Sequence, residues 1–516
     1  MPRFATAKTA WILCWALLSF WFIRPLWVAE ILPLNDLPNH LGRITALHYL
    51  NDPRWNLSQF YARSLGLVPY LGHFYPVHLM TYLFGTVTRA NRVYMSIYIA
   101  AAPLCGLAFA RALNRDPWLP MLLLPISVGV FFQWGFISFC VGTMLMLPTC
   151  ALFYRLIDEP TLGRAIALMF CTVTLYLCHV LPWGAFGLYA GVLLILEIPA
   201  RRWRSIAFAV PAMLPSVAVL AMGLVHAGDT GYIKHEKYLA QTDSPTKLLE
   251  RSVRLLDLWQ RQSIDEYIQL GLVAIVFFLL LTDRPKDAEP ARTRLRLPLA
   301  FLLFMLLAFV APYWIRQPFN WWMINIRFWM LVAAVGVFLP RGNIAGTRRV
   351  VLMLGLAVST VIPYYMARHF RSFSARVMPL IKLIKRTPLG STTLLLHQPA
   401  SHGRNFDDWE MAPEMSHWRE IYNYPLVYRG GYDPYLYDDG FPVKRIHELP
   451  APIVESAANW GTPDTRRFDQ YKHLEGWDYF IVKSEYADTL PADGSRLVDH
   501  EGDWQLHQNL QKTPVE

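Results

Sequence analysis

A carboxylate, an imidazole and a guanidinium occur within eight residues of one another early in the chain. They are Asp36, His40 and Arg43, in the segment 34–43. On a helix, His40 would lie one turn after Asp36, so the two side chains would share a face. A carboxylate can take a proton from an attacking hydroxyl, and cations can stabilise a departing phosphate. A structural role is the alternative, in which Asp36 caps a short surface helix and Pro38 lies in its first turn.

The composition indicates that this segment belongs to a membrane protein. Of the 516 residues, 54% are hydrophobic and 17% are charged, whereas a soluble protein has about 25% charged residues. Apolar runs repeat through residues 1–367, and residues 368–516 resemble an ordinary soluble domain. We therefore predict a polytopic α-helical membrane protein with a small C-terminal α/β domain, residues 368–516. The net charge of +10 comes from basic residues between apolar runs, which favours membrane lipids over nucleic acid as partners.

Eleven apolar segments are candidates for transmembrane helices. About 20 apolar residues are needed to cross roughly 30 Å of hydrocarbon. The first run has no small-residue cleavage site after it, so we interpret it as an uncleaved span rather than a signal peptide. The predicted spans are residues 10–30, 93–113, 117–132, 135–156, 164–181, 183–199, 204–225, 267–282, 297–313, 322–340 and 348–367.

The segment 69–87 is ambiguous, because it is apolar but contains His73, Pro76 and His78. If it does not span, every short loop rich in arginine falls on the N-terminal side of the membrane. That is the distribution required by the positive-inside rule. We therefore predict a cytoplasmic N-terminus, an outer C-terminal domain and two long outer loops, residues 31–92 and 226–266.

This topology places other ionisable residues on the same outer face as Asp36. Such groups at the ends of spans are costly and are functional candidates. The planar fork of Arg327 can bind a phosphate, although an arginine there can also reach lipid headgroups. His179 can equally be an interfacial histidine bonded to a backbone carbonyl. The predicted site has Asp36 as catalytic residue, and its substrate-binding residues are His40, Arg43, His179, Arg316 and Arg327.

The cysteines and histidines give no compact metal motif. All six cysteines lie in apolar segments, and no CxxC or Cys/His metal spacing occurs. We predict no cofactor, while the histidines near Asp36 leave a divalent metal open as an alternative. In the C-terminal domain, a basic amphipathic helix over 368–385 precedes short strand-like runs at 392–396, 479–482 and 504–506.

The layout resembles the GT-C superfamily of integral-membrane glycosyltransferases. It is similar in particular to protein O-mannosyltransferases, lipid A aminoarabinose transferases and rhizobial lipopolysaccharide galacturonosyltransferases. The matching features are the acid after the first span, the long first outer loop, the number of spans and the outer C-terminal domain. The resemblance implies a polyprenyl-phosphate sugar donor and a base or substrate-orienting role for Asp36. The commoner pattern has an Asp-Glu pair in the first loop, whereas here Asn35 and Leu37 flank a single acid.

The leading hypothesis is a transferase of the bacterial inner membrane. It would move a sugar from a polyprenyl phosphate to a glycolipid, polysaccharide or protein acceptor on the outer face. A transporter or flippase for a lipid-linked glycan is the first alternative, in which the charged residues would line a route. A non-catalytic scaffold for polysaccharide assembly is the second, with the C-terminal domain as its docking module.

Overall fold

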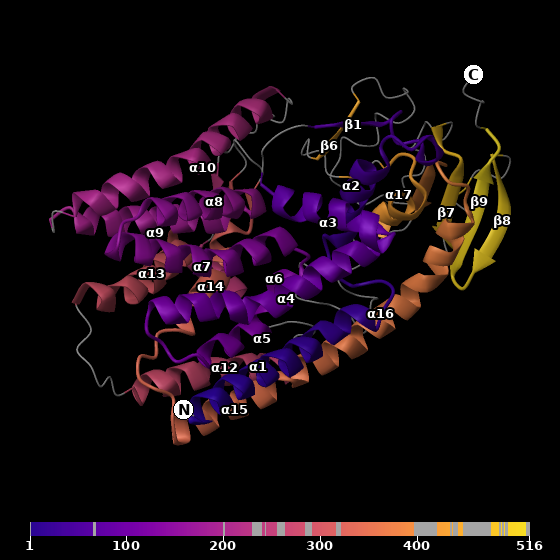
Figure 1. The fold of residues 1–516 in the computed structure, drawn as a ribbon. Helices are drawn as coiled ribbons and strands as arrows, with labels where there is room; N and C mark the ends of the chain where they lie inside the picture. The colour runs from indigo at the N-terminus through magenta and orange to yellow at the C-terminus, as the bar shows by residue number, and fades with distance from the viewer. Residues whose placement is uncertain are drawn as a thin grey trace. The chain divides into compact units, whose positions relative to one another are not determined.

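The structure is a computed structural model, and its helices and strands follow the apolar pattern of the sequence (Figure 1). The residues that the structure describes are 2–64, 69–199, 202–229, 240–242, 244–254, 264–283, 291–315, 321–396, 421–433, 436, 442–446, 476–484, 487, 490 and 494–511.

The chain forms two compact units that are interleaved along the sequence. Unit 1 contains residues 1–25, 67–73 and 95–366, and unit 2 contains residues 26–66, 74–94 and 367–516. Three of the boundaries between the units lie inside α-helices, namely α3 (Leu71–Phe84), α4 (Val87–Ala112) and α16 (Val361–Arg386), and one lies inside the 3-10 helix Arg24–Trp27. The predicted division into residues 1–367 and 368–516 stays a prediction.

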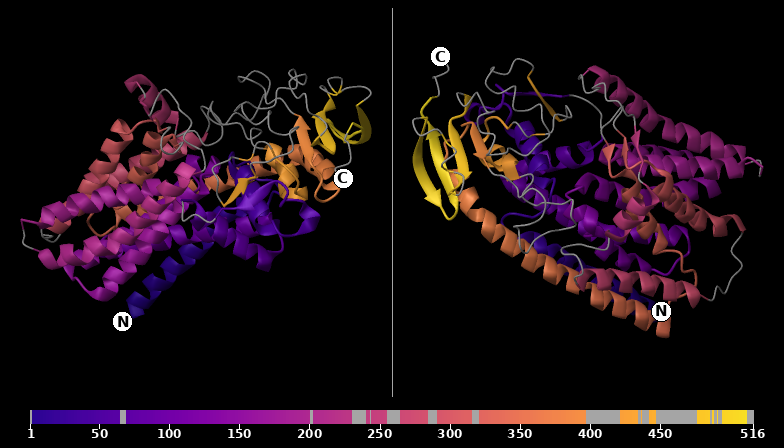
Figure 2. Two further views of the ribbon diagram at one scale, coloured as in Figure 1. Left: turned by 90° about the horizontal axis from the view of Figure 1, so that it is seen from above. Right: turned by 180° about the vertical axis from the view of Figure 1, so that it is seen from behind.

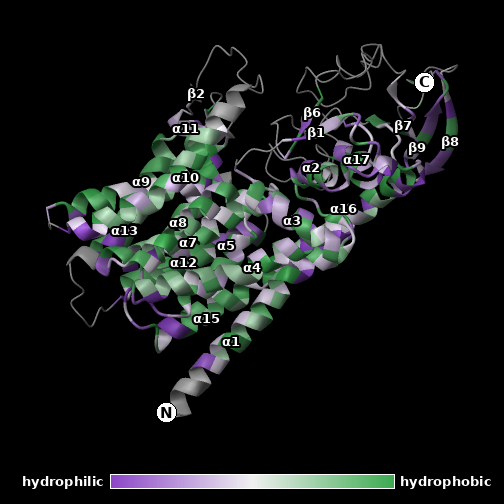
Figure 3. Ribbon diagram, turned by 45° about the horizontal axis from the view of Figure 1, so that its top comes forward, coloured by the Kyte–Doolittle hydropathy of each residue, from purple (hydrophilic) through white to green (hydrophobic). Residues whose placement is uncertain are grey.

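Unit 1 is a bundle of apolar helices. Helices α7, α8, α9 and α10 pack side by side, α13 packs on α14, and α12 packs on α15. Figure 3 shows that these helices are hydrophobic along most of their length. The helices of unit 1 include α1 (Pro2–Ile23), α5 (Leu123–Ser127), α6 (Val130–Gln133), α7 (Ile137–Asp158), α8 (Leu162–Cys178), α9 (Val180–Glu197), α10 (Trp203–Asp229), the polar α11 (Pro245–Arg254), α12 (Ile264–Leu281), α13 (Ala291–Val310), α14 (Ile324–Gly336) and α15 (Thr347–Ser359).

The helices of unit 1 confirm the polytopic membrane class. Seven segments among the described residues are long and apolar enough to cross a membrane, and three shorter apolar helices accompany them. The count of eleven spans stays a prediction. The ambiguous segment 69–87 forms α3, which has 14 residues and is therefore about 21 Å long. A helix of this length does not by itself cross the roughly 30 Å of hydrocarbon.

Unit 2 has a core built from both the first long loop and the C-terminal residues. Leu57 and Phe60 of the loop pack in one apolar cluster with Leu426, Leu394 and Phe480. Full burial of such a side chain contributes about 1.5–3 kcal/mol. The elements are α2 (Leu37–Tyr49), β1 (Tyr61–Arg63) and α17 (Tyr424–Arg429), and β1 pairs antiparallel with β6 (Val443–Arg445).

A four-stranded sheet forms the end of unit 2, in the order β5-β7-β9-β8. β5 (Thr393–Leu396) is parallel to β7 (Tyr479–Lys483), and β9 (Trp504–Asn509) is antiparallel to both β7 and β8 (Ser495–Glu501). Figure 2 shows these strands beside the last turns of α16. There, Lys382 forms an ion pair with Glu501 at 2.6 Å. The three predicted strand runs and the basic helix are confirmed.

The junction between α17 and the first loop depends on Gly430. This residue ends α17 with φ +77°, and a Cβ at that position would lie 2.3 Å from the Trp55 carbonyl oxygen. Gly430→Ala is therefore expected to destabilise the protein by more than about 2 kcal/mol, from the left-handed backbone and the clash together. Thermal unfolding of the detergent-solubilised chain measures the effect.

The matched control for Gly430→Ala is Gly502→Ala. Gly502 also has a positive φ, +55°, but an added Cβ would meet only Pro379, at an ordinary 3.5 Å. Gly502→Ala should therefore lose only the stability that a positive φ costs a non-glycine residue, about 1–2 kcal/mol. Equal losses of stability in the two variants would show that the close contact with Trp55 contributes nothing.

Candidate functional site

Asp36 lies at the beginning of α2, but its carboxylate does not cap the helix. It occupies the N-cap position with helical backbone angles, and its side chain makes no capping hydrogen bond. Its Oδ1 instead accepts a hydrogen bond of 2.8 Å from Asn35 Nδ2. Asp36 is partly exposed, whereas Asn35 is buried. The simple capping interpretation is therefore wrong for the side chain, and the carboxylate is oriented by a neighbouring amide.

His40 and Arg43 follow Asp36 on the same helix, four and seven residues later, which places all three residues toward one face. The ring of His40 is 5.5 Å from that of Phe74 between centroids. Arg43 is only 3% exposed, and its Nε donates to Asn39 Oδ1 at 3.1 Å. Unit 2 thus presents an acid, an imidazole and a buried guanidinium on α2.

The position of α2 follows from close packing in unit 2. Leu41, Ile44 and Leu47 are buried and give the helix an apolar face with the spacing expected for an amphipathic helix. Gly42 allows a close approach, because a Cβ there would lie 3.0 Å from Leu436 Cδ1 and 3.2 Å from Leu426 Cδ2. The helix is therefore held closely by the C-terminal segments of the same unit.

In unit 1, His179 and Arg327 come together although 148 residues separate them. His179 joins two helices, because it is the C-cap residue of α8 and the N-cap residue of α9. Its Nδ1 accepts a hydrogen bond of 3.0 Å from the Leu181 backbone N–H. Its Nε2 lies 3.2 Å from NH1 of Arg327, in the first turn of α14. Both side chains are buried.

The hydrogen bonding of His179 determines what this pair can bind. A neutral imidazole accepts with one nitrogen and donates with the other. Because Nδ1 accepts from Leu181, the proton is inferred to lie on Nε2. Nε2 and the Arg327 guanidinium are then two donors that face each other. An oxygen atom of an anion can accept from both, and a phosphate is suited to such charge-assisted bonds.

Aromatic rings hold both members of the pair in place. The Arg327 guanidinium lies 3.9 Å from the centroid of the Phe136 ring, a cation–π contact. The His179 ring meets Phe139 at 5.4 Å and Tyr70 at 5.3 Å between centroids. The Tyr70 backbone N–H in turn donates to the Cys178 carbonyl at 3.2 Å. The planes of the imidazole and the guanidinium are therefore restricted.

The structure thus groups the predicted site residues in two sets. Asp36, His40 and Arg43 lie in unit 2, and His179 and Arg327 lie in unit 1. Arg316 lies outside the described residues. The sequence reasoning did not single out Phe136, Phe139 or Tyr70. The aromatic run at residues 131–136, where the predicted spans 117–132 and 135–156 meet, is a signal that could have drawn attention to Phe136.

No cluster of three or more metal-binding side chains occurs among the residues that the structure describes. A pair of histidines does meet in unit 2. His48 Nδ1 and His78 Nδ1 are 3.2 Å apart, and Tyr82 packs on the His48 ring at 4.5 Å. One histidine must donate and the other accept, so the contact requires at least one neutral ring.

This pair predicts a dependence of stability on pH. Burial lowers the pKa of His78 from 6.5 to about 4, with further contributions from His48 and Arg63. In the window between these values, the unfolded chain binds more protons than the folded chain, so stability falls as the pH falls. The unfolding midpoint should therefore drop as the pH is lowered from about 6.5 to about 4, and His78→Asn should make the dependence shallower.

The control for this measurement is His500→Asn, which removes an exposed histidine of β8. If His78→Asn kept the full wild-type dependence on pH, or if His500→Asn flattened it as much, the histidine pair would not be its source.

The fold is that of a multi-pass helical membrane protein, and it has counterparts among solved structures. The crystal structure of ArnT from Cupriavidus metallidurans bound to undecaprenyl phosphate matches with a TM-score of 0.57 and 12% identity, over 98% of this chain and 99% of that chain. The arabinofuranosyltransferase AftD from mycobacteria matches with a TM-score of 0.50 and 12% identity, over 97% of this chain and 40% of that chain. The chain therefore shares the fold of ArnT, which agrees with the fold that the sequence resemblance predicted.

The likeness is one of fold and not of sequence. No protein-family model matches the chain, and no curated protein sequence matches it. ArnT in its apo state gives nearly the same agreement, with a TM-score of 0.56 and 12% identity.

Proposed function

We propose that this chain is a glycosyltransferase that moves a sugar from a polyprenyl phosphate to a hydroxyl of a glycolipid, polysaccharide or protein. The observation that carries the proposal is the buried pair of donors, His179 Nε2 and Arg327 NH1, 3.2 Å apart. Two such donors inside a helical bundle can bind the oxygen atoms of a lipid phosphate by charge-assisted hydrogen bonds. The fold likeness to ArnT, whose structure holds undecaprenyl phosphate, supports a lipid of this class as the donor.

In the proposed reaction, Asp36 is the general base. The acceptor hydroxyl attacks the anomeric carbon of the sugar, and the carboxylate takes the hydroxyl proton. The bond between that carbon and the phosphate oxygen breaks, and its electron pair leaves with the polyprenyl phosphate. The Asn35 amide, which donates to Asp36 Oδ1 at 2.8 Å, orients the carboxylate for this step.

The cationic residues act on the leaving phosphate. His179 and Arg327 would donate to its oxygen atoms, whose negative charge grows as the bond breaks. Arg43, Arg316 and His40 complete the proposed substrate-binding set. No metal or cofactor is part of this scheme.

The proposal includes an orientation in the membrane. The N-terminus lies in the cytoplasm of a bacterium, and residues 368–516 lie on the outer side of the inner membrane, where the donor and acceptor also meet. The positive-inside distribution of the arginine clusters supports this assignment.

The test is consumption of a lipid-linked sugar by the purified full chain in lipid nanodiscs. Undecaprenyl phosphates carrying different labelled sugars are supplied with a glycolipid acceptor mixture, and released undecaprenyl phosphate is measured together with labelled product. Stoichiometric release and transfer are expected for at least one donor. In parallel proteoliposomes, movement of the intact labelled lipid across the bilayer without its consumption would contradict the proposal and indicate a transporter.

A further inference from the structure

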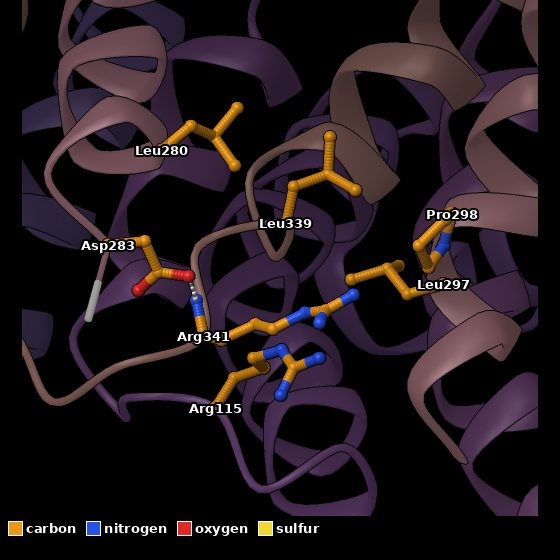
Figure 4. A pocket seen from close by; sticks show the side chains of 7 residues that line it. All are labelled: Arg115, Leu280, Asp283, Leu297, Pro298, Leu339 and Arg341. Atoms are coloured by element: carbon orange, nitrogen blue, oxygen red, sulfur yellow. Dashed lines mark hydrogen bonds between the residues drawn. The ribbon is translucent and has the colours of Figure 1, made fainter. Parts of the chain in front are cut away.

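Two arginines, Arg115 and Arg341, face a cavity in unit 1, away from His179 and Arg327. The cavity measures about 300 Å³, which is the lower end of the range for sites of small ligands. Arg115 and Arg341 supply its charge, and Leu280, Leu297 and Leu339 are among its apolar lining residues (Figure 4). An amphipathic lining of this kind suits a ligand with one anionic group and one apolar part.

The fold holds both guanidinium groups at the cavity. Arg115 is only 6% exposed, and it donates from Nε to the Phe338 carbonyl at 3.2 Å and from NH1 to the Leu113 carbonyl at 2.9 Å. Arg341 donates from NH2 to the Arg294 carbonyl at 3.3 Å. Figure 4 shows the two guanidinium groups next to each other, both extending toward Leu297.

Asp283, the acid in the lining, is engaged by the neighbouring loop. Its carboxylate accepts from the backbone N–H groups of Arg341 and Gly342, at 2.9 and 2.7 Å. It also forms an ion pair with Arg348 at 3.3 Å. In Figure 4 this carboxylate points to the Arg341 backbone and not to either guanidinium. The negative charge of Asp283 is therefore compensated by the loop backbone and by Arg348. The cavity keeps a positive character from Arg115 and Arg341.

We propose that this cavity binds the phosphate group of an amphipathic phosphate ester. Two guanidinium groups side by side repel each other, and an anion between them removes that repulsion. The forked N–H groups of arginine match the oxygen atoms of a phosphate. The leucine side chains contact the apolar part of the ligand. A membrane phospholipid and a soluble phosphate ester share this chemistry.

The ligand of this cavity is distinct from the proposed sugar donor. Arg327 lies in the first turn of α14, whereas Leu339 and Arg341 follow the last residue of that helix, Gly336. Gly336 lies nine residues after Arg327 in the helix, which corresponds to about 14 Å along the axis. The two sites therefore lie toward opposite ends of α14 within unit 1.

The experiment is a titration of the full-length protein in detergent, followed by native mass spectrometry. The probes are phosphatidylglycerol, phosphatidylcholine of the same acyl chains, and glycerol 3-phosphate. We expect the wild type to bind phosphatidylglycerol at least about tenfold more tightly than phosphatidylcholine. Arg341→Gln should weaken phosphatidylglycerol binding about tenfold or more. Arg341→Lys keeps the charge but not the planar fork, so its affinity for phosphatidylglycerol should lie between those of the wild type and Arg341→Gln.

The matched control is Arg349→Gln, which removes an exposed arginine from the same region of the chain. Its affinity for phosphatidylglycerol should stay within about twofold of the wild type, because exposed charges contribute little. Competition by glycerol 3-phosphate at similar concentrations would identify a soluble ester as the ligand, and failure to compete would identify a lipid. Equal losses in the two glutamine variants, or no measurable binding of either phosphatidylglycerol or glycerol 3-phosphate to the wild type, would overturn the proposal.

Discussion

Replacement of Asp36 by asparagine is expected to reduce sugar transfer by about 10²- to 10⁴-fold, the range that a general base contributes. Asparagine has nearly the same shape but cannot take the acceptor proton. Because the Asp36 side chain makes no capping hydrogen bond to α2, insertion, abundance and thermal stability should change little. Initial rates of transfer, normalised to folded protein in nanodiscs, measure the effect.

The control for Asp36→Asn is Asp52→Asn, which alters another carboxylate of the first long loop. Asp52 pairs with exposed Arg54 at 2.7 Å and caps the short helix Pro53–Trp55. Its replacement should leave the transfer rate within about twofold of the wild type, because exposed ion pairs are weak. A wild-type rate in the Asp36 variant would remove Asp36 from the reaction.

Removal of the Arg327 guanidinium is expected to weaken binding of the lipid-linked donor about 10- to 100-fold. This corresponds to the roughly 1.5–3 kcal/mol of a hydrogen bond to a charged group. Arg327→Lys should fall between the wild type and Arg327→Gln, since it retains the charge without the planar fork. Donor affinity, measured by native mass spectrometry on the nanodisc-embedded chain, is the direct readout.

A double variant of His179 and Arg327 tests whether the two side chains bind the same phosphate. If His179 Nε2 and Arg327 NH1, 3.2 Å apart, donate to the same phosphate, the effects of His179→Asn and Arg327→Gln should not add. The double variant should then bind the donor about as weakly as the single variant that has the lower donor affinity. Strictly additive losses would show that the two side chains do not share a ligand.

The fold was largely predictable because the lengths and spacing of the apolar runs indicate where its helices and strands form. Long apolar runs became the helices of unit 1, and the short runs at 392–396, 479–482 and 504–506 became strands of one sheet. The common core of the first loop and the C-terminal residues was not predictable. Phe60 and Phe480 pack in the same cluster across more than 400 residues, and no local pattern encodes such a pairing.

The candidate site was predictable only in part, for a similar reason. The distribution of arginines predicts that His179 and Arg327 lie on one side of the membrane, but it could not show that they touch. Their contact depends on the turn at His179 between α8 and α9 and on the Phe136 ring under the guanidinium. The capping interpretation of Asp36 failed because the helix begins without using its carboxylate. The catalytic role of Asp36 stays a prediction.

The most direct test of the account measures donor binding and turnover in one preparation. The wild type, Asp36→Asn and Arg327→Gln are placed in identical nanodiscs with the labelled undecaprenyl-phosphate sugar that the wild type consumes. The account predicts that Asp36→Asn binds this donor as tightly as the wild type but releases undecaprenyl phosphate about 10²- to 10⁴-fold more slowly. It also predicts that Arg327→Gln binds the donor weakly. Normal turnover by Asp36→Asn, together with unchanged donor affinity in Arg327→Gln, would contradict it.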